Sequence, residues 1–236
     1  MKNNTKLYLI PSGLGADDNL SVLPTQTTDL IKELQIFVVE NIRTARRFLK
    51  SIDKGIHIDS LFLLELNEHT NKKELDEIWN KIKDHNVGII SEAGCPAVAD
   101  PGSDLVAIAH KNNKEVVPLI GPSSILLALM GSGMNGQGFA FCGYLPVKTP
   151  ARINAIKKLE IVSTQTKQTQ IFIETPYRNV ALFQDILKSC RANTLLCVAC
   201  DLTSHAQKIK TRSIKEWQRE ELDIHKRPTV FLLHAY

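Results

Sequence analysis

The stretch Val87-Gly-Ile-Ile-Ser-Glu-Ala-Gly-Cys-Pro-Ala-Val-Ala-Asp-Pro-Gly102, followed by Val116-Val-Pro-Leu-Ile-Gly-Pro-Ser-Ser124, decides the fold. Each part is an apolar, β-branched run that breaks into a turn of Gly, Pro and small polar residues, which predicts a buried strand ending in a loop. Glycine lacks a Cβ and proline fixes φ, so such turns let a backbone approach a ligand closely. In open α/β sheets, ligands lie beyond the carboxyl ends of the strands. We therefore expect the binding site at these two turns.

Apolar runs alternate with helical patterns through the first half of the chain. The runs predict strands at residues 6–10, 37–40, 61–66, 87–90 and 116–120. Alternation of this kind is typical of βαβ units and a mostly parallel sheet. The second half has more strands and fewer helices, which favours a mixed sheet; its strands are expected at 139–144, 170–174, 194–201, 208–212 and 228–234. The predicted fold class is α/β in two domains, residues 1–120 and 121–236.

The helices follow from apolar residues at a spacing of three and four. They are expected at residues 25–34, 42–52, 71–82, 104–112, 123–131, 149–161 and 177–190. Asn71-Lys-Lys-Glu74 and Ser213-Ile-Lys-Glu216 are capping boxes, in which a side chain and a backbone N–H at the helix start bond each other reciprocally. Each box predicts that a helix begins there.

The composition is that of an ordinary soluble protein. Of the 236 residues, 43% are hydrophobic and 23% are charged, as in typical globular domains. No apolar run approaches the roughly 18 residues of a membrane span, and the first apolar segment is too short for a signal peptide. The five cysteines are odd in number and irregularly spaced, which favours a reducing compartment. We expect a cytoplasmic protein with no membrane partner.

Two groups of basic residues each follow a predicted strand. They are Arg43, Arg46, Arg47 and Lys50, and Lys148, Arg152, Lys157 and Lys158. A basic helix face is often only solvated, but basic groups just past strand ends would also suit a phosphate-bearing substrate. The net charge of +4 is too small for a protein that coats nucleic acid, and it leaves a local contact with nucleic acid open.

Three short motifs have simple structural explanations. Gly131-Ser-Gly-Met-Asn-Gly136 matches the dinucleotide fingerprint but follows a helix and precedes a strand, the reverse of the required order, so we expect a helix-ending turn. Cys197 and Cys200 lie in one predicted strand, where residues three apart face opposite sides, so no metal site is expected. Gly121-Pro-Ser-Ser124 could bind an anion at a helix start, or Ser123 could only cap its helix, and both can hold.

Seven further segments, spread in order along nearly the whole chain, carry a family resemblance. They are Leu7-Tyr-Leu9, Glu40-Asn-Ile-Arg-Thr-Ala-Arg-Arg47, Asn67-Glu-His69, Gly143-Tyr-Leu-Pro146, Phe172-Ile-Glu-Thr-Pro-Tyr-Arg178, Ala199-Cys-Asp-Leu-Thr203 and the terminal strand. Together with the opening stretch they resemble the tetrapyrrole methylase superfamily. The most similar branch methylates the ribose 2′-oxygen of a cytidine in small-subunit ribosomal RNA and carries a Ser-Asp-Ala-Gly-Thr-Pro…Ser-Asp-Pro-Gly run followed by Pro-Gly-Pro-Ser.

The resemblance implies two α/β domains, with S-adenosylmethionine (SAM) in the cleft between them, and a homodimer. It places the cofactor against Glu92, Ala93, Gly94, Cys95, Pro96 and Val98, against Ser123 and Ser124, and against Ile173, Ala199, Pro228 and Thr229. SAM is a sulfonium, so such a pocket needs no metal. Catalysis would consist mainly of aligning the methyl group with the nucleophile, with a base to take the hydroxyl proton.

The acceptor side departs more from the family pattern than the cofactor loops do. Asn41 stands where an Asp is expected, Tyr177 where a His is expected, and Cys200 where an Arg is expected. The candidates that remain on the acceptor side place arginines on phosphates and offer a carboxylate or an imidazole as base. They are Glu40, Arg43, Arg47, Glu68 and His69.

The sequence thus predicts a SAM-dependent methyltransferase that acts on ribosomal RNA or the small ribosomal subunit. One alternative is a corrin-type tetrapyrrole C-methyltransferase, whose glycine-rich first loop and Gly-Asp-Pro signature are not matched here. The other is a non-catalytic relative that binds SAM or RNA. The lost charges at Asn41, Tyr177 and Cys200 motivate this second alternative.

Overall fold

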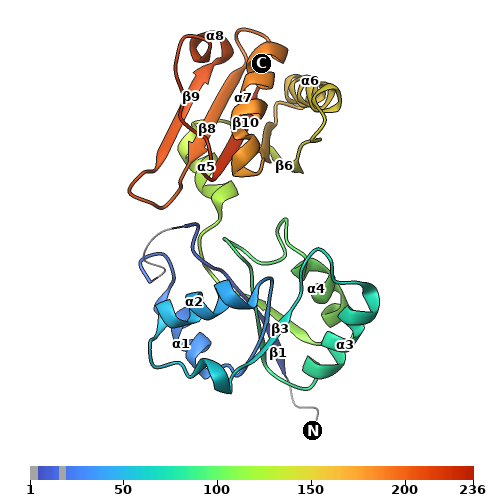
Figure 1. Ribbon diagram of the computed structural model, residues 1–236. Helices are drawn as coiled ribbons and strands as arrows, with labels where there is room; N and C mark the ends of the chain where they lie inside the picture. Colours follow the sequence, from blue (N-terminus) through green and yellow to red (C-terminus); the bar gives the residue numbers. More distant parts are fainter. Residues whose placement is uncertain (1–4, 16–19) are drawn as a thin grey trace. The chain divides into compact units, whose positions relative to one another are not determined.

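A computed structural model describes residues 5–15 and 20–236 of the protein. The chain divides into two compact units, Met1–Ser123 and Ser124–Tyr236. This division falls within a few residues of the boundary expected at residue 120. Figure 1 shows that each unit has its own sheet with its own helices.

The sheet of the first unit is parallel throughout. Its strands are β1 (Lys6–Ile10), β2 (Ile36–Val39), β3 (Phe62–Glu65), β4 (Val87–Ile90) and β5 (Glu115–Pro118). They lie in the order β3-β2-β4-β1-β5, and every pairing among them is parallel. The predicted parallel sheet is confirmed, and each strand lies within two residues of its predicted position.

Helices cover both faces of this sheet (Figure 1). On one face, α1 (Thr25–Glu33) and α2 (Ile42–Ile52) bury an apolar cluster that includes Ile31, Leu49 and Phe37. On the other, α3 (Lys72–Ile82) and α4 (Gly102–Lys111) pack Ile82 and Leu105 against strand residues. The strands read as continuous apolar runs because both faces are buried. A short 3₁₀ turn, η1 (Ile58–Ser60), precedes β3.

The neighbouring strands β1 and β4 send the chain to opposite faces of the sheet. After β1 the chain continues to α1, and after β4 it continues to α4. The two strands pair in register up to Ile10 and Ile90, so their outgoing loops begin side by side. Such a switch point is where open α/β sheets bind ligands. It coincides with the first of the two turns singled out in the sequence.

The second unit has a mixed sheet, as predicted. Its strands are β6 (Phe139–Tyr144), β7 (Thr169–Ile173), β8 (Leu195–Cys200), β9 (Lys208–Ser213) and β10 (Thr229–His234). Their order is β6-β7-β10-β8-β9; β6 and β7 pair in parallel, and the other pairs are antiparallel. Successive side chains along each strand point to opposite faces of this sheet, and residues paired across strands share a face.

Helices of the second unit also divide between the two faces. The larger core packs side chains of β7, β8 and β10 against α6 (Thr149–Thr166), α7 (Asn179–Ser189) and α8 (Ile214–Trp217). The other face carries α5 (Ser124–Ser132), which contacts β8, β9 and β10. Between β7 and α7 the chain forms a 3₁₀ turn, η2 (Pro176–Arg178).

Several local predictions are confirmed and others are corrected. Both capping boxes are formed, and the glycine-rich motif ends α5 in a turn with Gly133 at φ +70°. The helix expected at 149–161 continues to Thr166, and the helix expected from Tyr177 begins at Asn179 because η2 precedes it. Arg152, grouped above with surface cations, is buried and pairs with Asp185 through its Nε at 2.8 Å.

The described residues contain neither a metal-binding cluster nor a helix that could span a membrane. Within residues 5–15 and 20–236, no group of His, Cys, Asp and Glu side chains is placed to hold a metal ion. Within the same ranges, none of the helices combines the length and apolar character that crossing a bilayer requires.

Gly88 lies in the middle of β4 where no side chain fits. A Cβ there would be 2.5 Å from Ile10 Cδ1 and 2.9 Å from Phe37 Cδ1. Gly88→Ala should therefore lower the free energy of unfolding of the first unit by about 1–3 kcal/mol, the usual cost of overpacking a core. Urea unfolding, followed by Trp79 fluorescence in a Trp217→Phe background, measures it. Gly55→Ala is the control in the same unit, since its Cβ would meet only the side chain of Asp53; an equal effect of the two changes would contradict the packing argument.

Candidate functional site

Three loops are tied together at the carboxyl edge of the first unit's sheet. Ser12 and Gly94 exchange two backbone hydrogen bonds, at 2.9 and 3.2 Å, which form an isolated antiparallel bridge. The Ser12 hydroxyl donates to the Ser91 carbonyl at 3.0 Å, and the Cys95 thiol lies 3.5 Å from the Pro122 carbonyl oxygen. The loops after β1, β4 and β5 are thus held as one backbone assembly.

Two glycines make this assembly possible. Gly94 has φ +75°, a conformation that side-chain-bearing residues rarely adopt, and its Cβ would contact Leu14 and the Pro122 carbonyl. At Gly121 a Cβ would lie 2.3 Å from the Pro11 Cβ. The predicted role of these turns, a close approach of backbone to backbone, is therefore present in the geometry.

The segment after Pro96 is a strained loop held by one carboxylate. Ala97 and Ala99 have φ of 64° and 55°, which costs free energy for residues with a Cβ. Asp100 Oδ1 accepts from the Ala97 N–H at 3.2 Å and from the Gly102 N–H at 2.7 Å. Val98, expected behind the cofactor loop, instead has 48% of its surface exposed.

Glu40 lies directly after β2 among other carboxylates. The pKa of Glu40 is raised, first by burial and then by the negative charge of Asp100; Glu92 and Glu68 add to the rise, and a hydrogen bond from the Glu92 backbone opposes it. Glu92 itself accepts a hydrogen bond from the Thr44 hydroxyl. A carboxylate with a raised pKa is a stronger base than an ordinary one, so Glu40 can take a proton from a substrate hydroxyl.

Asn41 has a structural role that the sequence did not indicate. Its Oδ1 accepts from the backbone N–H groups of Arg43, at 2.9 Å, and Thr44, at 3.2 Å, and so caps α2. Asp and Asn cap helices about equally well. The departure from the family's Asp therefore preserves the helix start while removing a charge.

The start of α2 presents two exposed arginines next to a cavity. Arg43 and Arg47 are one helical turn apart, so they lie on the same side of α2. Arg47 lines a cavity of about 330 Å³ together with Thr44, Glu92 and the Ser12–Gly13 turn. This cavity belongs to the first unit alone.

His69 and Glu68 lie on a turn after β3. Their side chains are 85% and 84% exposed, and His69 Nε2 is 3.7 Å from Glu68 Oε1. Glu68 contributes to the raised pKa of Glu40, whereas within the described residues no hydrogen bond joins His69 to Glu40. Of the two candidate bases, Glu40 is partly buried and His69 is exposed.

The four residues expected around the adenosine gather at one edge of the second unit's sheet, but not on one face. Ile173 and Ala199 both pair with Val230 of β10, so their side chains share the face of α5. Thr229 pairs with Cys200 and faces the opposite side, where its hydroxyl donates to the Arg227 carbonyl at 2.9 Å. Pro228 is exposed. Ser123 and Ser124 stand at the start of α5.

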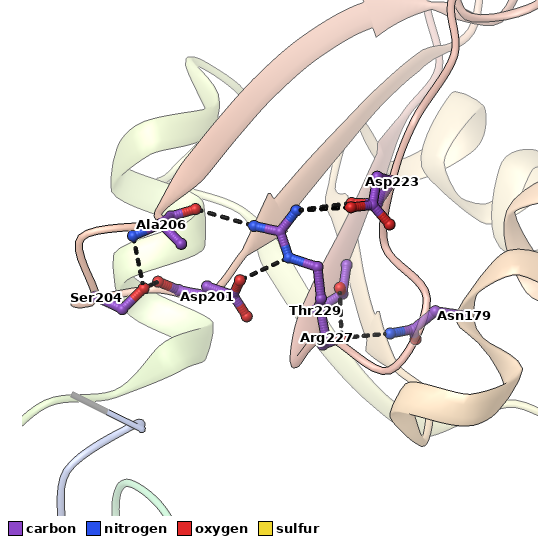
Figure 2. Close-up of polar contacts among 7 residues, drawn as sticks. All are labelled: Asn179, Asp201, Ser204, Ala206, Asp223, Arg227 and Thr229. Atoms are coloured by element: carbon purple, nitrogen blue, oxygen red, sulfur yellow. Dashed lines mark hydrogen bonds and ion pairs between the residues drawn. The ribbon is translucent and has the colours of Figure 1, made fainter. Parts of the chain in front are cut away.

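Arg227 fixes the loop that carries Pro228, a role that the sequence did not reveal (Figure 2). Its guanidinium donates to Asp201 Oδ2 at 2.7 Å, to the Ala206 carbonyl at 3.0 Å and to the Asp223 carbonyl at 2.9 Å. The Arg227 carbonyl in turn accepts from Asn179 Nδ2 at 2.7 Å. These hydrogen bonds hold together the loop after β8, the loop before β10 and the start of α7.

Buried polar atoms without a hydrogen-bond partner gather in the same region. Among the described residues they are Glu174 Oε2, Arg178 Nε, Asn179 Oδ1 and Thr203 Oγ1. All four follow the carboxyl ends of β7 or β8. Unsatisfied buried groups are costly and mark places where a ligand or water is to be expected. Within the second unit these atoms fit a polar ligand, and within the first unit the turns at Gly94 and Gly121 fit a ligand held close to backbone.

The raised pKa of Glu40 can be checked directly. In a ¹³C NMR titration of the side-chain carboxyl, Glu40 should titrate above the ordinary value of 4.5. Asp100→Asn should lower the pKa of Glu40, because it removes the negative charge while Asn Oδ1 can still accept the two loop hydrogen bonds. Asp104→Asn, on the first turn of α4, is the control. A Glu40 pKa that does not respond to Asp100→Asn would contradict the assigned cause.

Comparison with curated proteins finds relatives along nearly the whole chain. The chain is 28% identical over 232 residues to "Ribosomal RNA small subunit methyltransferase I" of Buchnera aphidicola subsp. Schizaphis graminum, covering 96% of this chain and 77% of that protein. It is also 28% identical over 234 residues to the protein of the same name from Vibrio cholerae, covering 98% and 77%. No protein-family model matches the chain.

Solved structures share the fold at low sequence identity. Diphthine synthase matches with a TM-score of 0.69 at 12% identity, covering 98% of this chain and 90% of that one. The methyltransferase CobJ matches with 0.64 at 14%, covering 98% and 94%. Uroporphyrin III C-methyl transferase from Thermus thermophilus matches with 0.58 at 15%, covering 97% of each chain.

These matches confirm the resemblance that the motifs indicate. The curated relatives match in sequence over both units, and the methyltransferase structures match in fold over both units. The chain is similar over almost its full length to the ribosomal RNA small subunit methyltransferase I proteins, at 28% identity, and it shares its fold with the methyltransferase structures.

Proposed function

We propose that this protein transfers a methyl group from SAM to a ribose 2′-hydroxyl of small-subunit ribosomal RNA. The observation that carries the proposal is the similarity, over 96% of the chain or more, to proteins named ribosomal RNA small subunit methyltransferase I. Such a substrate is found in the cytoplasm, in agreement with the composition. The tetrapyrrole enzymes among the structural neighbours support a shared fold and not a shared substrate.

The proposed cofactor contacts come from both units. In the first unit they are the backbone and small side chains of Glu92–Pro96, which Ser12 and Pro122 hold in place. In the second unit they are Ile173 and Ala199 on one face of the sheet, with Pro228 on the loop that Arg227 fixes. Thr229 contributes through its backbone, because its side chain faces Cys200. SAM bound there would supply an electrophilic methyl group on a sulfonium.

The protein's own residues then have two tasks. Glu40 accepts the proton of the acceptor hydroxyl, because its raised pKa makes it a better base than an exposed carboxylate. The backbone assembly of Ser12, Gly94 and Pro122 is rigid, which keeps the reacting groups aligned.

Methyl transfer can be measured with tritium-labelled SAM and small ribosomal subunits from a strain that lacks the homologous enzyme. The wild-type protein should label the RNA, and Glu40→Gln should lower the rate on the order of 10²-fold or more. The wild-type rate should rise with pH through the pKa of Glu40, because the deprotonated form is the active one. This rise should be absent in Glu40→Gln.

Calorimetry with SAM separates loss of the base from loss of the cofactor site. Glu40→Gln should bind SAM as the wild type does, and Glu77→Gln, on the exposed side of α3, should retain full activity. If the wild type binds no SAM at millimolar concentration, the proposed function is wrong. SAM binding without labelling of the RNA would instead favour a non-catalytic relative.

Arg43 and Arg47 are proposed to bind RNA phosphates next to the cavity beside α2. Arg43→Ala combined with Arg47→Ala should reduce the slope of log affinity against log salt by about 1.4, since each phosphate contact on a single strand contributes about 0.7. Filter binding to small subunits at several salt concentrations measures it. Lys81→Ala combined with Lys83→Ala removes the same charge at the far end of α3, where a comparable loss of slope would contradict the assignment.

The resemblance also leads us to propose a homodimer. Light scattering of the purified protein measures its mass in solution. A mass near 26.4 kDa at all concentrations would overturn this part of the proposal.

A further inference from the structure

Two tyrosine rings are exposed where β6 and β7 end. Tyr177, on η2, has 73% of its surface exposed, and Tyr144, the last residue of β6, has 57% exposed. Tyr144 pairs in register with Ile173, the last residue of β7, so both rings belong to the same edge of the sheet. Large aromatic side chains normally bury 150–250 Å². Neither ring does so here.

The backbone around Tyr177 is held rigidly although its ring is exposed. The Lys226 N–H donates to the Pro176 carbonyl at 3.1 Å, and Asn179 Nδ2 donates to the Arg227 carbonyl at 2.7 Å. These two bonds tie η2 and the start of α7 to the loop before β10. Arg227, clamped by Asp201 and the Ala206 carbonyl, fixes that loop in turn (Figure 2). The backbone that carries the Tyr177 ring is therefore held in place by these hydrogen bonds.

Two cations accompany the rings. Lys226 Nζ lies 5.6 Å from the centroid of the Tyr177 ring, within the range of a cation–π contact. Arg178 follows Tyr177 and is anchored to Glu174 at 2.6 Å, with 37% of its side chain exposed while that of Glu174 is fully buried. The pKa of Arg178 is raised, first by its hydrogen bond to Glu174 and to a smaller extent by Tyr144.

Neither an ordinary core role nor a chance surface position explains this arrangement. The rings are too exposed to stabilise the core, and the side chain of Lys226 lies over the ring of Tyr177. Tyr177 is also close in the chain to the proposed cofactor contacts, four residues after Ile173, and Lys226 is two residues before Pro228. Exposed aromatic rings beside cations on a rigid frame are the features with which proteins bind unpaired nucleic-acid bases.

We propose that Tyr177 and Tyr144 form a stacking subsite for unpaired bases of the RNA substrate, with Lys226 and Arg178 contacting the flanking phosphates. This subsite rests on the proposed function, because it concerns the same RNA. It assigns a use to Tyr177, which stands where the family pattern has a His. A tyrosine offers a larger stacking surface than an imidazole and carries no charge.

The test is the affinity for a fluorescein-labelled, single-stranded RNA of mixed sequence, measured by anisotropy. Tyr177→Ala should weaken binding on the order of 5- to 100-fold, the range for a lost base–aromatic stack. Tyr177→Phe should bind as the wild type does, because the ring remains. Lys226→Ala should lower the salt slope by about 0.7, the contribution of one phosphate contact.

Tyr236→Ala is the matched control. Tyr236 is also exposed, at 68%, but it follows β10 at the opposite edge of the sheet and packs its ring against His234. Its loss should leave RNA affinity unchanged. Trp217 fluorescence during unfolding checks that each variant remains folded, since Trp217 lies in the core of the same unit.

The outcomes separate this subsite from the proposed function. Wild-type RNA affinity in Tyr177→Ala, with SAM binding and methyl transfer intact, overturns the subsite alone. A change of mass in light scattering without a change in RNA affinity means that the rings contact a second protein copy, and it also overturns the subsite. Failure of the wild type to bind SAM overturns the proposed function, whereas ring-dependent RNA binding would still support the subsite.

Discussion

The parallel pairing of β1 with β4 is the contact on which the candidate site depends. It brings Ile10 and Ile90 level with each other, so that the two loops leaving them start side by side and then part to opposite faces of the sheet. The pairing tolerates no side chain at Gly88, because Ile10 and Phe37 fill that space. Everything at the carboxyl edge follows from it, including the Ser12–Gly94 bridge and the position of Glu92 beside α2.

Asp100 links the shape of the loop to the chemistry proposed for Glu40. Through two backbone N–H groups it holds a loop in which Ala97 and Ala99 have positive φ. Burial raises the pKa of Glu40 most, and the same carboxylate raises it further by charge repulsion. Strain in a backbone persists only where the surroundings enforce it. One side chain thus enforces the strained loop and tunes the proposed base.

The sequence predicted the elements well because the strands are short apolar runs, most helices have apolar residues spaced three and four apart, and α3 and α8 begin with capping boxes. It predicted less well where the outcome depends on distant residues. Arg152 lies among surface cations in sequence, and only the fold shows that Asp185, on another helix, buries it. The end of α6 also involves residues outside the helix, because the Lys167 carbonyl accepts from Asn135 Nδ2 at 2.7 Å.

Some features of the candidate site could likewise be predicted from the sequence, and others only from the fold. The glycine and proline turns could be found from the sequence, because their composition itself determines the backbone. The clamp by Arg227 could not, because its partners Asp201, Ala206 and Asp223 come from separate loops. The different faces of Ala199 and Thr229 become visible only in the register with β10.

The charges at the edge of the first unit separate the place proposed for SAM from the place proposed for the RNA backbone. Glu40, Glu68, Glu92 and Asp100 make the region around Glu40 acidic, which suits a cationic sulfonium and opposes a phosphate. Arg43 and Arg47 lie on the adjoining face of α2. If the proposed function holds, the RNA backbone is therefore held along α2, and only the acceptor ribose reaches the carboxylates. Asn41 fits this division, because it keeps the cap of α2 without adding another negative charge beside the arginines.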